Sequence, residues 1–168
     1  PTRRSSDLSS VSGAAAGAGV SLAFSGDFVV CADNAKFIMA FVNLGLVPDT
    51  GGTYLFVKSL GIQKAMELCV TGRPMKAQEA KDAGMVYDVV PAEELDDTVM
   101  KLAKKFASGP LLSYKNIKKQ IYQAGLADYK KYLDECEIPT QRECAASSDF
   151  IEGVKAFMEK RKAEFKGE

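Results

Sequence analysis

Short apolar runs alternate with glycine-bounded helical segments in the first half of this chain. Runs at residues 28–32, 36–41 and 85–90 are compact and rich in β-branched or aromatic residues, which predicts buried strands. The segments between them have helical spacing and end at glycines. These predicted short helices cover residues 14–24, 53–60, 63–70 and 77–83. The pattern predicts an α/β layer for this half.

The second half is helical in pattern almost throughout. From Glu93 onward apolar residues recur every three or four positions, with lysines off the apolar face. The predicted stripes are Leu95, Val99, Leu102 and Phe106; Tyr114, Ile117 and Ile121; Tyr129, Tyr132, Leu133 and Cys136; and Phe150, Val154, Phe157 and Met158. Apolar helical stripes usually bury, so we expect these side chains in a core or a subunit interface.

Three stretches differ in composition and suggest a division of the chain. Residues 1–8 are polar and unlike the rest of the sequence, so we expect a non-native or disordered arm. Residues 9–92 carry the α/β pattern, although residues 9–12 (SSVS) are a poor strand, and residues 93–168 carry the helical one. With so few strands for a sheet, we expect that an N-terminal part of the fold is missing from this chain.

Composition excludes several kinds of function. The 168 residues carry 22 basic and 22 acidic side chains, so no electrostatic footprint for nucleic acid or a membrane surface is present. The sequence has no apolar run of transmembrane length. Histidine is absent, which excludes a Ser-His-Asp nucleophile system and argues against zinc, and we expect no metal site.

The four cysteines have no metal-ligand spacing. Three of them lie in apolar or helical contexts, which is typical of reduced, partly buried thiols, and we expect a cytoplasmic protein. The charge and hydropathy patterns lead us to expect no nucleic-acid or membrane partner.

A glycine- and alanine-rich segment at residues 13–19 (GAAAGAG) stands directly before an apolar helical run. Small residues let a polar ligand atom approach the backbone, and the unpaired amides of a helix N-terminus bind an anion or a developing oxyanion. A tight packing point that needs small side chains is an equally good interpretation of this segment alone. A dinucleotide fingerprint is excluded, because the glycine spacing differs and no good strand precedes it.

Seven segments in this order resemble the crotonase superfamily, the enoyl-CoA hydratase/isomerase family. They are SGAAAGAGVSLA at residues 12–23, DFVVCA at 27–32, KF at 36–37, GLVPDTGGT at 45–53, LCVTG at 68–72, AQEAKDAGMV at 77–86 and FMEKRK at 157–162. The segment at 45–53 most resembles the isomerases, especially the ring-opening isomerase of phenylacetate breakdown. The resemblance implies a spiral of ββα units followed by a helical trimerisation region, a homotrimer or dimer of trimers, and acyl-CoA substrates.

The resemblance also assigns residues to an oxyanion hole. One of its two backbone N–H donors matches Ala18, and the other lies in the earlier half of the family fold, which this chain lacks. We expect Gly17, Gly19 and Phe41 to contact the substrate. On the same basis Phe157 and Lys160 match positions near the adenine and 3′-phosphate of CoA on a neighbouring subunit, although a solvated charged face is equally compatible with the run around Lys160.

The chain departs from the hydratase pattern at both catalytic glutamates. Ser21 and Phe41 occupy those positions, and neither side chain can act as a carboxylate base. Asp49 matches the catalytic carboxylate of the family isomerases, so the resemblance implies that it takes a proton beside the thioester and returns it two carbons along. From spacing alone, Asp49 or Thr50 could instead be an ordinary cap of the following helix.

Three functions remain as hypotheses. The first is an acyl-CoA isomerase that shifts a C=C bond, or rearranges a ring-epoxide aryl-acetyl-CoA, through an enolate. The second is a hydratase or lyase of the same family. The third is a truncated CoA-binding or assembly subunit that lacks catalysis, and we expect this chain alone to be inactive. None of the three requires a cofactor, because CoA is part of the substrate.

Overall fold

The computed structural model describes residues 7–167. Residues 1–6 of the expected N-terminal arm therefore lie outside the described residues. The described chain divides into two compact units. The first unit comprises residues 7–15, 22–37 and 75–128, and the second comprises residues 16–21, 38–74 and 129–167. The predicted boundary between residues 92 and 93 stays a prediction.

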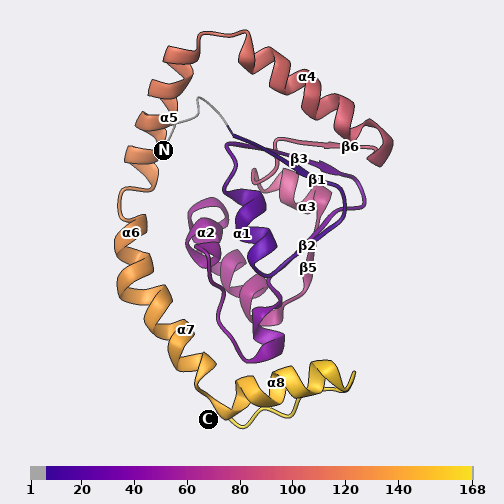
Figure 1. The fold of residues 1–168 in the computed structure, drawn as a ribbon, viewed down its shortest axis with the longest axis vertical. Coiled ribbons are helices and arrows are strands. Elements are labelled where there is room, and N and C mark those ends of the chain that lie inside the picture. The colour runs from indigo at the N-terminus through magenta and orange to yellow at the C-terminus, as the bar shows by residue number, and fades with distance from the viewer. Residues whose placement is uncertain (1–6, 168) are drawn as a thin grey trace. The chain divides into compact units, whose positions relative to one another are not determined.

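A three-stranded parallel sheet forms the centre of the first unit (Figure 1). Its order is β1 (Leu8–Val11), β3 (Phe28–Ala32) and β6 (Asp88–Val90). The register places Leu8 opposite Phe28 and Val30 opposite Asp88. The strand predicted at residues 28–32 is therefore confirmed and lies in the middle of the sheet.

Strand β1 corrects the prediction of a poor strand at residues 9–12. Ser9 and Ser10 pair with Val29 and Val30 of the central strand. Two serines have little strand preference of their own, but pairing with a buried apolar neighbour decides the outcome in a sheet. Local composition was therefore a poor guide at this edge.

Four helical segments complete the first unit. They are α3 (Ala77–Asp82), the 3-10 turn η2 (Ala92–Glu94), α4 (Leu95–Ala107) and α5 (Leu111–Gly125). Figure 1 shows α4 alongside β1 and β3, which it contacts. The predicted stripe of α4 is confirmed, because Leu95 and Leu102 are buried in the core with Val30 and Ala32. Val99 and Phe106 pack against that core as partly buried neighbours.

The second unit is helical. It holds the 3-10 helix η1 (Ala40–Leu44), α2 (Gly52–Thr71), α6 (Tyr129–Tyr132), the π-helical segment η3 (Leu133–Glu137), α7 (Ile138–Ala145) and α8 (Ser148–Met158). Helix α2 is kinked at Gly61, which has φ 74° and ψ 168°. The kink confirms the two shorter helices predicted on either side of this glycine.

The remaining elements are α1 (Ala18–Phe24) and the strands of a second sheet. The sheet has the order β2 (Ala14–Ala16), β4 (Lys36–Ile38) and β5 (Pro74–Lys76). Two predictions are wrong in detail here. The helix predicted from residue 14 begins as a strand, and the strand predicted over residues 36–41 ends at Ile38 and turns into η1.

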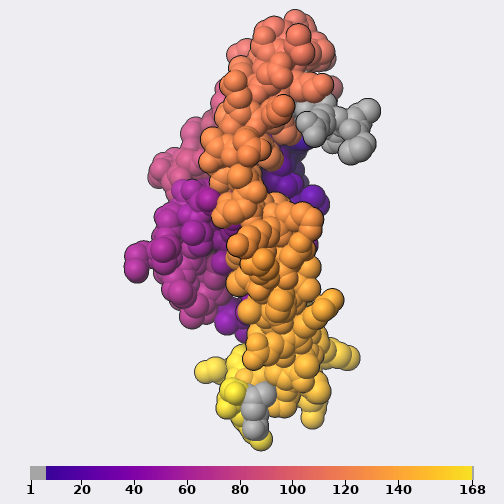
Figure 2. All heavy atoms as spheres, turned by 90° about the vertical axis from the view of Figure 1, so that its left-hand side faces the viewer, coloured from indigo at the N-terminus to yellow at the C-terminus, as the bar shows by residue number. Residues whose placement is uncertain are grey.

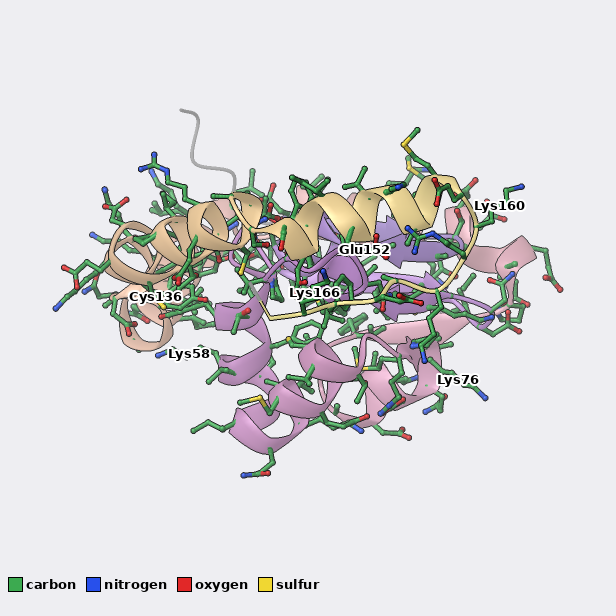
Figure 3. All side chains as sticks on the ribbon, turned by 90° about the horizontal axis from the view of Figure 1, so that it is seen from below. Lys58, Lys76, Cys136, Glu152, Lys160 and Lys166 are labelled. Atoms are coloured by element: carbon green, nitrogen blue, oxygen red, sulfur yellow. The ribbon has the colours of Figure 1, made fainter. Side chains whose placement is uncertain are left out.

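The apolar stripe predicted on α8 is only partly buried. Phe157 and Met158 are 76% and 77% exposed, whereas Gly153 and Ala156 are the buried residues of this helix. Figure 3 shows the C-terminal segment with Lys166 running back beside α8. Asp149 holds this segment by accepting the backbone N–H groups of Lys166 and Gly167 at 2.7 and 2.8 Å.

Candidate active site

The amide of Ala18 lies at the first position of α1. Gly17 before it has φ 55°, and its N–H donates to the Ile38 carbonyl at 2.9 Å. The first amides of a helix have no acceptor within it, and no other described residue accepts the N–H of Ala18. Because Ala18 itself does not have a positive φ, alanine adopts this backbone without strain.

Residues around this amide are small or apolar. Ala18 and Gly19 are exposed. The buried ring of Phe41, carried by η1, lies 3.7 Å from where a Cβ would stand on Gly17. The hydroxyl of Ser21, one turn further along α1, is also buried. The predicted contact residues Gly17, Gly19 and Phe41 therefore lie near the start of α1.

Asp49 lies in the turn that leads into α2, in the same unit as Ala18. Its backbone carbonyl accepts the Ser21 hydroxyl at 3.1 Å and the Gly52 N–H at 3.0 Å. The first bond ties the turn to α1, and the second ties it to the first residue of α2. The carboxylate of Asp49 is half-buried, and its contacts are the Thr50 hydroxyl at 3.3 Å and the Gln141 amide at 3.4 Å.

The alternative interpretation of Asp49 as a helix cap is wrong. The N-cap of α2 is Gly51, which has no side chain that could accept a capping hydrogen bond. Thr50 does not cap the helix either, because its hydroxyl donates back to the Asp49 carbonyl at 2.8 Å. The carboxylate of Asp49 is therefore not used to satisfy the amides at the start of α2.

A buried carboxylate that was not predicted from the sequence accepts the N–H of Gly51. Glu137 is only 5% exposed, and its two oxygens accept the Gly51 N–H at 3.1 and 3.0 Å. Burial raises the pKa of Glu137, and the nearby Asp49 raises it further, while the bonds from the Gly51 and Thr50 backbone lower it.

Gln141 lies one helical turn after Glu137 and links the same group to Asp49. Its Nε2 donates to Asp49 Oδ2, while its buried Oε1 has no partner among the described residues. A Glu and a Gln four residues apart share one face of a helix, but nothing in the sequence marks that face as the buried one. The predicted face instead contained Cys136, which is exposed.

The two predicted CoA contacts lie at the C-terminal end of α8. Phe157 is exposed, and Lys160, labelled in Figure 3, follows the helix with φ 55°. The neighbouring Arg161 is engaged in a two-bond ion pair with Glu152 at 2.6 and 2.9 Å. No described residue forms a salt bridge with Lys160. The assignment of both residues to CoA stays a prediction.

The described part of the chain lacks two further kinds of feature. Residues 7–167 contain no cluster of three or more Cys, Asp or Glu placed to hold a metal ion. None of the helices within that range is both long and apolar enough to span a membrane.

Comparison with known proteins identifies the family. The profile of the enoyl-CoA hydratase/isomerase family matches residues 7–168. The chain is 42% identical over 160 residues to the 1,2-epoxyphenylacetyl-CoA isomerase of Escherichia coli, with 95% of this chain and 61% of that protein covered. It is 39% identical over 158 residues to the trans-2-decenoyl-[acyl-carrier-protein] isomerase of Streptococcus mutans, with 94% and 60% covered.

Solved structures agree with this result. The crystal structure of an enoyl-CoA hydratase from Mycobacterium avium subsp. paratuberculosis superposes with a TM-score of 0.88 at 35% identity, over 92% of this chain and 62% of that one. The chain therefore spans about 60% of the length of the curated relatives it matches. The predicted fold class, an α/β crotonase fold, is confirmed. The chain belongs to the enoyl-CoA hydratase/isomerase family, the crotonase superfamily.

Proposed function

We propose that the protein is an acyl-CoA isomerase in which Asp49 is the proton-transferring base. The observation that carries the proposal is the state of the Asp49 carboxylate. It does not cap α2, and it lies in the same unit as the Ala18 amide, for which the described residues 7–167 offer no acceptor. A half-buried carboxylate and an N–H that can hold an oxyanion are the minimum needed for proton transfer through an enolate.

The proposed reaction has two proton transfers. The Ala18 N–H donates to the thioester oxygen, and the carboxylate of Asp49 removes a proton from the carbon beside the thioester carbonyl. The electron pair of the C–H bond moves into a dienolate, whose oxygen the amide stabilises. The protonated Asp49 then returns the proton two carbons further along, and the double bond becomes conjugated with the thioester. A second oxyanion donor is expected from the earlier half of the family fold.

Two of these relatives favour isomerisation and suggest two substrate classes. One is an epoxyphenylacetyl-CoA isomerase and the other an isomerase of an acyl-carrier-protein thioester. We propose an enoyl-CoA or a ring-epoxide aryl-acetyl-CoA as the substrate, with no cofactor beyond the CoA that the substrate carries. For CoA recognition we propose Phe157 and Lys160, and for assembly a homotrimer or a dimer of trimers.

Hydration is the second candidate, because an enoyl-CoA hydratase is among the similar structures. Ser21 and Phe41 argue against it, since they stand where the resemblance places the two hydratase carboxylates. Activation of water and protonation of carbon by two separate acids would need other side chains. Water addition to crotonyl-CoA measures this activity directly.

The test is the variant Asp49→Asn in the complete gene product, assayed on a 3-enoyl-CoA by the absorbance of the conjugated product. Loss of a general base lowers kcat by about 10²–10⁴-fold. The matched control is Asp33→Asn, which removes an exposed carboxylate from a turn of the first unit. Turnover by Asp49→Asn equal to wild type would remove Asp49 from the mechanism.

The third hypothesis is a non-catalytic CoA-binding or assembly subunit. We expect residues 1–168 alone to show little turnover. A thermal-shift titration with CoA and with an acyl-CoA separates ligand binding from assembly alone, because only a ligand that binds the folded state raises the unfolding temperature.

A further inference from the structure

We propose that Glu137 is a positioning residue for Asp49, which it serves by holding the Thr50–Gly51 turn through the Gly51 amide. This inference rests on the proposed function, because it names a residue that supports the proposed base. Glu137 comes from the helical region late in the chain, far in sequence from the turn it binds. Figure 2 shows the surface formed by the segment that holds α6, η3 and α7. Glu137, at the end of η3, is buried.

The turn between Asp49 and α2 needs an external anchor. Thr50 has φ 52° and Gly51 has φ 79°, so two successive residues are left-handed. A left-handed conformation at a residue other than glycine costs of order 1–3 kcal/mol and persists only where its surroundings enforce it. The direction of the Asp49 carboxylate depends on this turn, because Asp49 directly precedes it.

Glu137 supplies that anchor with an unusual arrangement for a carboxylate. Both of its oxygens accept the same Gly51 N–H, at 3.1 and 3.0 Å, and the residue is 5% exposed. A buried carboxylate is costly to keep, so it needs its donors, and its charge lies favourably at the N-terminus of α2. In a capping box the N–H of the N-cap residue is accepted by a side chain at the third position of the same helix, whereas here it is accepted by a side chain from η3.

Aromatic side chains fix the backbone of the segment that carries Glu137. The ring of Tyr54 on α2 lies 5.0 Å from that of Tyr129 and 5.3 Å from that of Tyr132, measured between centroids. The Tyr129 hydroxyl lies 3.5 Å from the Thr50 carbonyl. The anchor is therefore itself held in place, as a residue that positions a reacting group must be.

Gln141 completes the connection on the other side of the base. Its Nε2 reaches Asp49 Oδ2 at 3.4 Å, and it lies four residues after Glu137 on the same helical face. The η3–α7 segment thus contacts both the backbone after Asp49 and the carboxylate of Asp49. We expect a change at Glu137 to alter the placement of the base more than the binding of substrate.

The experiment compares Glu137→Ala and Glu137→Gln with wild type in the complete gene product. Misplacement of a reacting group by about 1 Å costs roughly 10²-fold in rate, so we expect this loss in kcat for Glu137→Ala with KM within about twofold. Glu137→Gln keeps one acceptor for the Gly51 N–H and should recover part of the rate, to within about tenfold of wild type. The matched control is Glu135→Gln, which removes an exposed carboxylate from the same π-helical segment.

Amide exchange gives a readout that does not depend on turnover. Deuterium uptake of a peptide containing residues 50–52 should be faster in Glu137→Ala than in wild type, with Glu135→Gln unchanged. Exchange as slow as in wild type overturns the proposal. So does faster exchange in a folded Glu137→Ala variant whose kcat stays within about twofold of wild type.

The outcomes separate this proposal from the proposed function. If Asp49→Asn abolishes turnover while both Glu137 variants retain it, Asp49 is the base and Glu137 is not its positioning residue. If the wild-type gene product does not isomerise enoyl-CoA, the proposed function fails, and the exchange measurement alone decides whether Glu137 holds the turn. The positioning role is also overturned if the fractional loss of activity in Glu137→Ala is fully explained by the fraction of molecules that are unfolded.

Discussion

Replacement of Gly153 by alanine should undock α8 from η1. A Cβ on Gly153 would lie 2.7 Å from the carbonyl carbon, the Cα and the oxygen of Leu44. All three are backbone atoms of η1, so no flexible side chain can move aside. Overpacking costs about 1–3 kcal/mol, and a clash with backbone belongs at the upper end of that range. Alanine gains about 1 kcal/mol over glycine inside a helix, which leaves a net loss of about 1–2 kcal/mol.

Urea unfolding followed by far-UV circular dichroism and tyrosine fluorescence measures this loss. The matched control is Gly125→Ala at the end of α5, where nothing lies within 4 Å of the added Cβ. Only helix propensity acts at that position, so the control should be neutral or more stable by up to about 1 kcal/mol. If Gly153→Ala is as stable as Gly125→Ala, the close approach of α8 and η1 is not what the structure indicates.

Two further predictions concern cysteine reactivity and pH. Burial raises the pKa of Cys31 to about 11, so at pH 8 an alkylating reagent should label the exposed Cys136 first and Cys31 only on unfolding. Peptide mass spectrometry measures the labelling of each cysteine. Rapid labelling of Cys31 in the folded protein would contradict its burial. Hydrogen bonds from Arg161 lower the pKa of Glu152 to about 2 from an ordinary 4.5, so the stabilisation by this pair is present above pH 4.5 and is lost as the pH falls through about 2. A carboxyl NMR titration in which Glu152 protonates near pH 4.5 would show that the ion pair does not persist in solution.

Much of the fold was predictable where the apolar spacing and the positions of helix-interrupting glycines agree. The stripe of α4 and the central strand β3 follow directly from their apolar spacing. The kink of α2 was predictable because Gly61 interrupts an otherwise continuous helical pattern. Strand β1 was not predictable from composition, since two serines enter the sheet only through their pairing with β3.

The late helices show why a periodic pattern did not predict that Glu137 is buried. A π-helical turn has more residues than an α-helical one. Within Leu133–Glu137, the residue that faces inward is therefore one position later in the sequence than α-helical spacing predicts. Regular spacing carried forward from Tyr129 and Tyr132 predicts Cys136 as the next inward residue. After the π-helical turn the inward residue is Glu137, and Cys136 is exposed. No count of three and four residues along the sequence reveals that shift.

This shift bears directly on the candidate site. Spacing alone favoured Asp49 as a cap, because an acidic residue just before a helix usually satisfies its first amides. In this protein a carboxylate from more than eighty residues away satisfies the Gly51 amide. The local rule fails at Asp49 because α2 begins after Gly51, whose own N–H is held by this distant carboxylate, and such failures of local rules are expected at functional positions. The π-helical turn that turns Cys136 outward is thus the same feature that brings Glu137 to the turn after Asp49, the base of the proposed reaction.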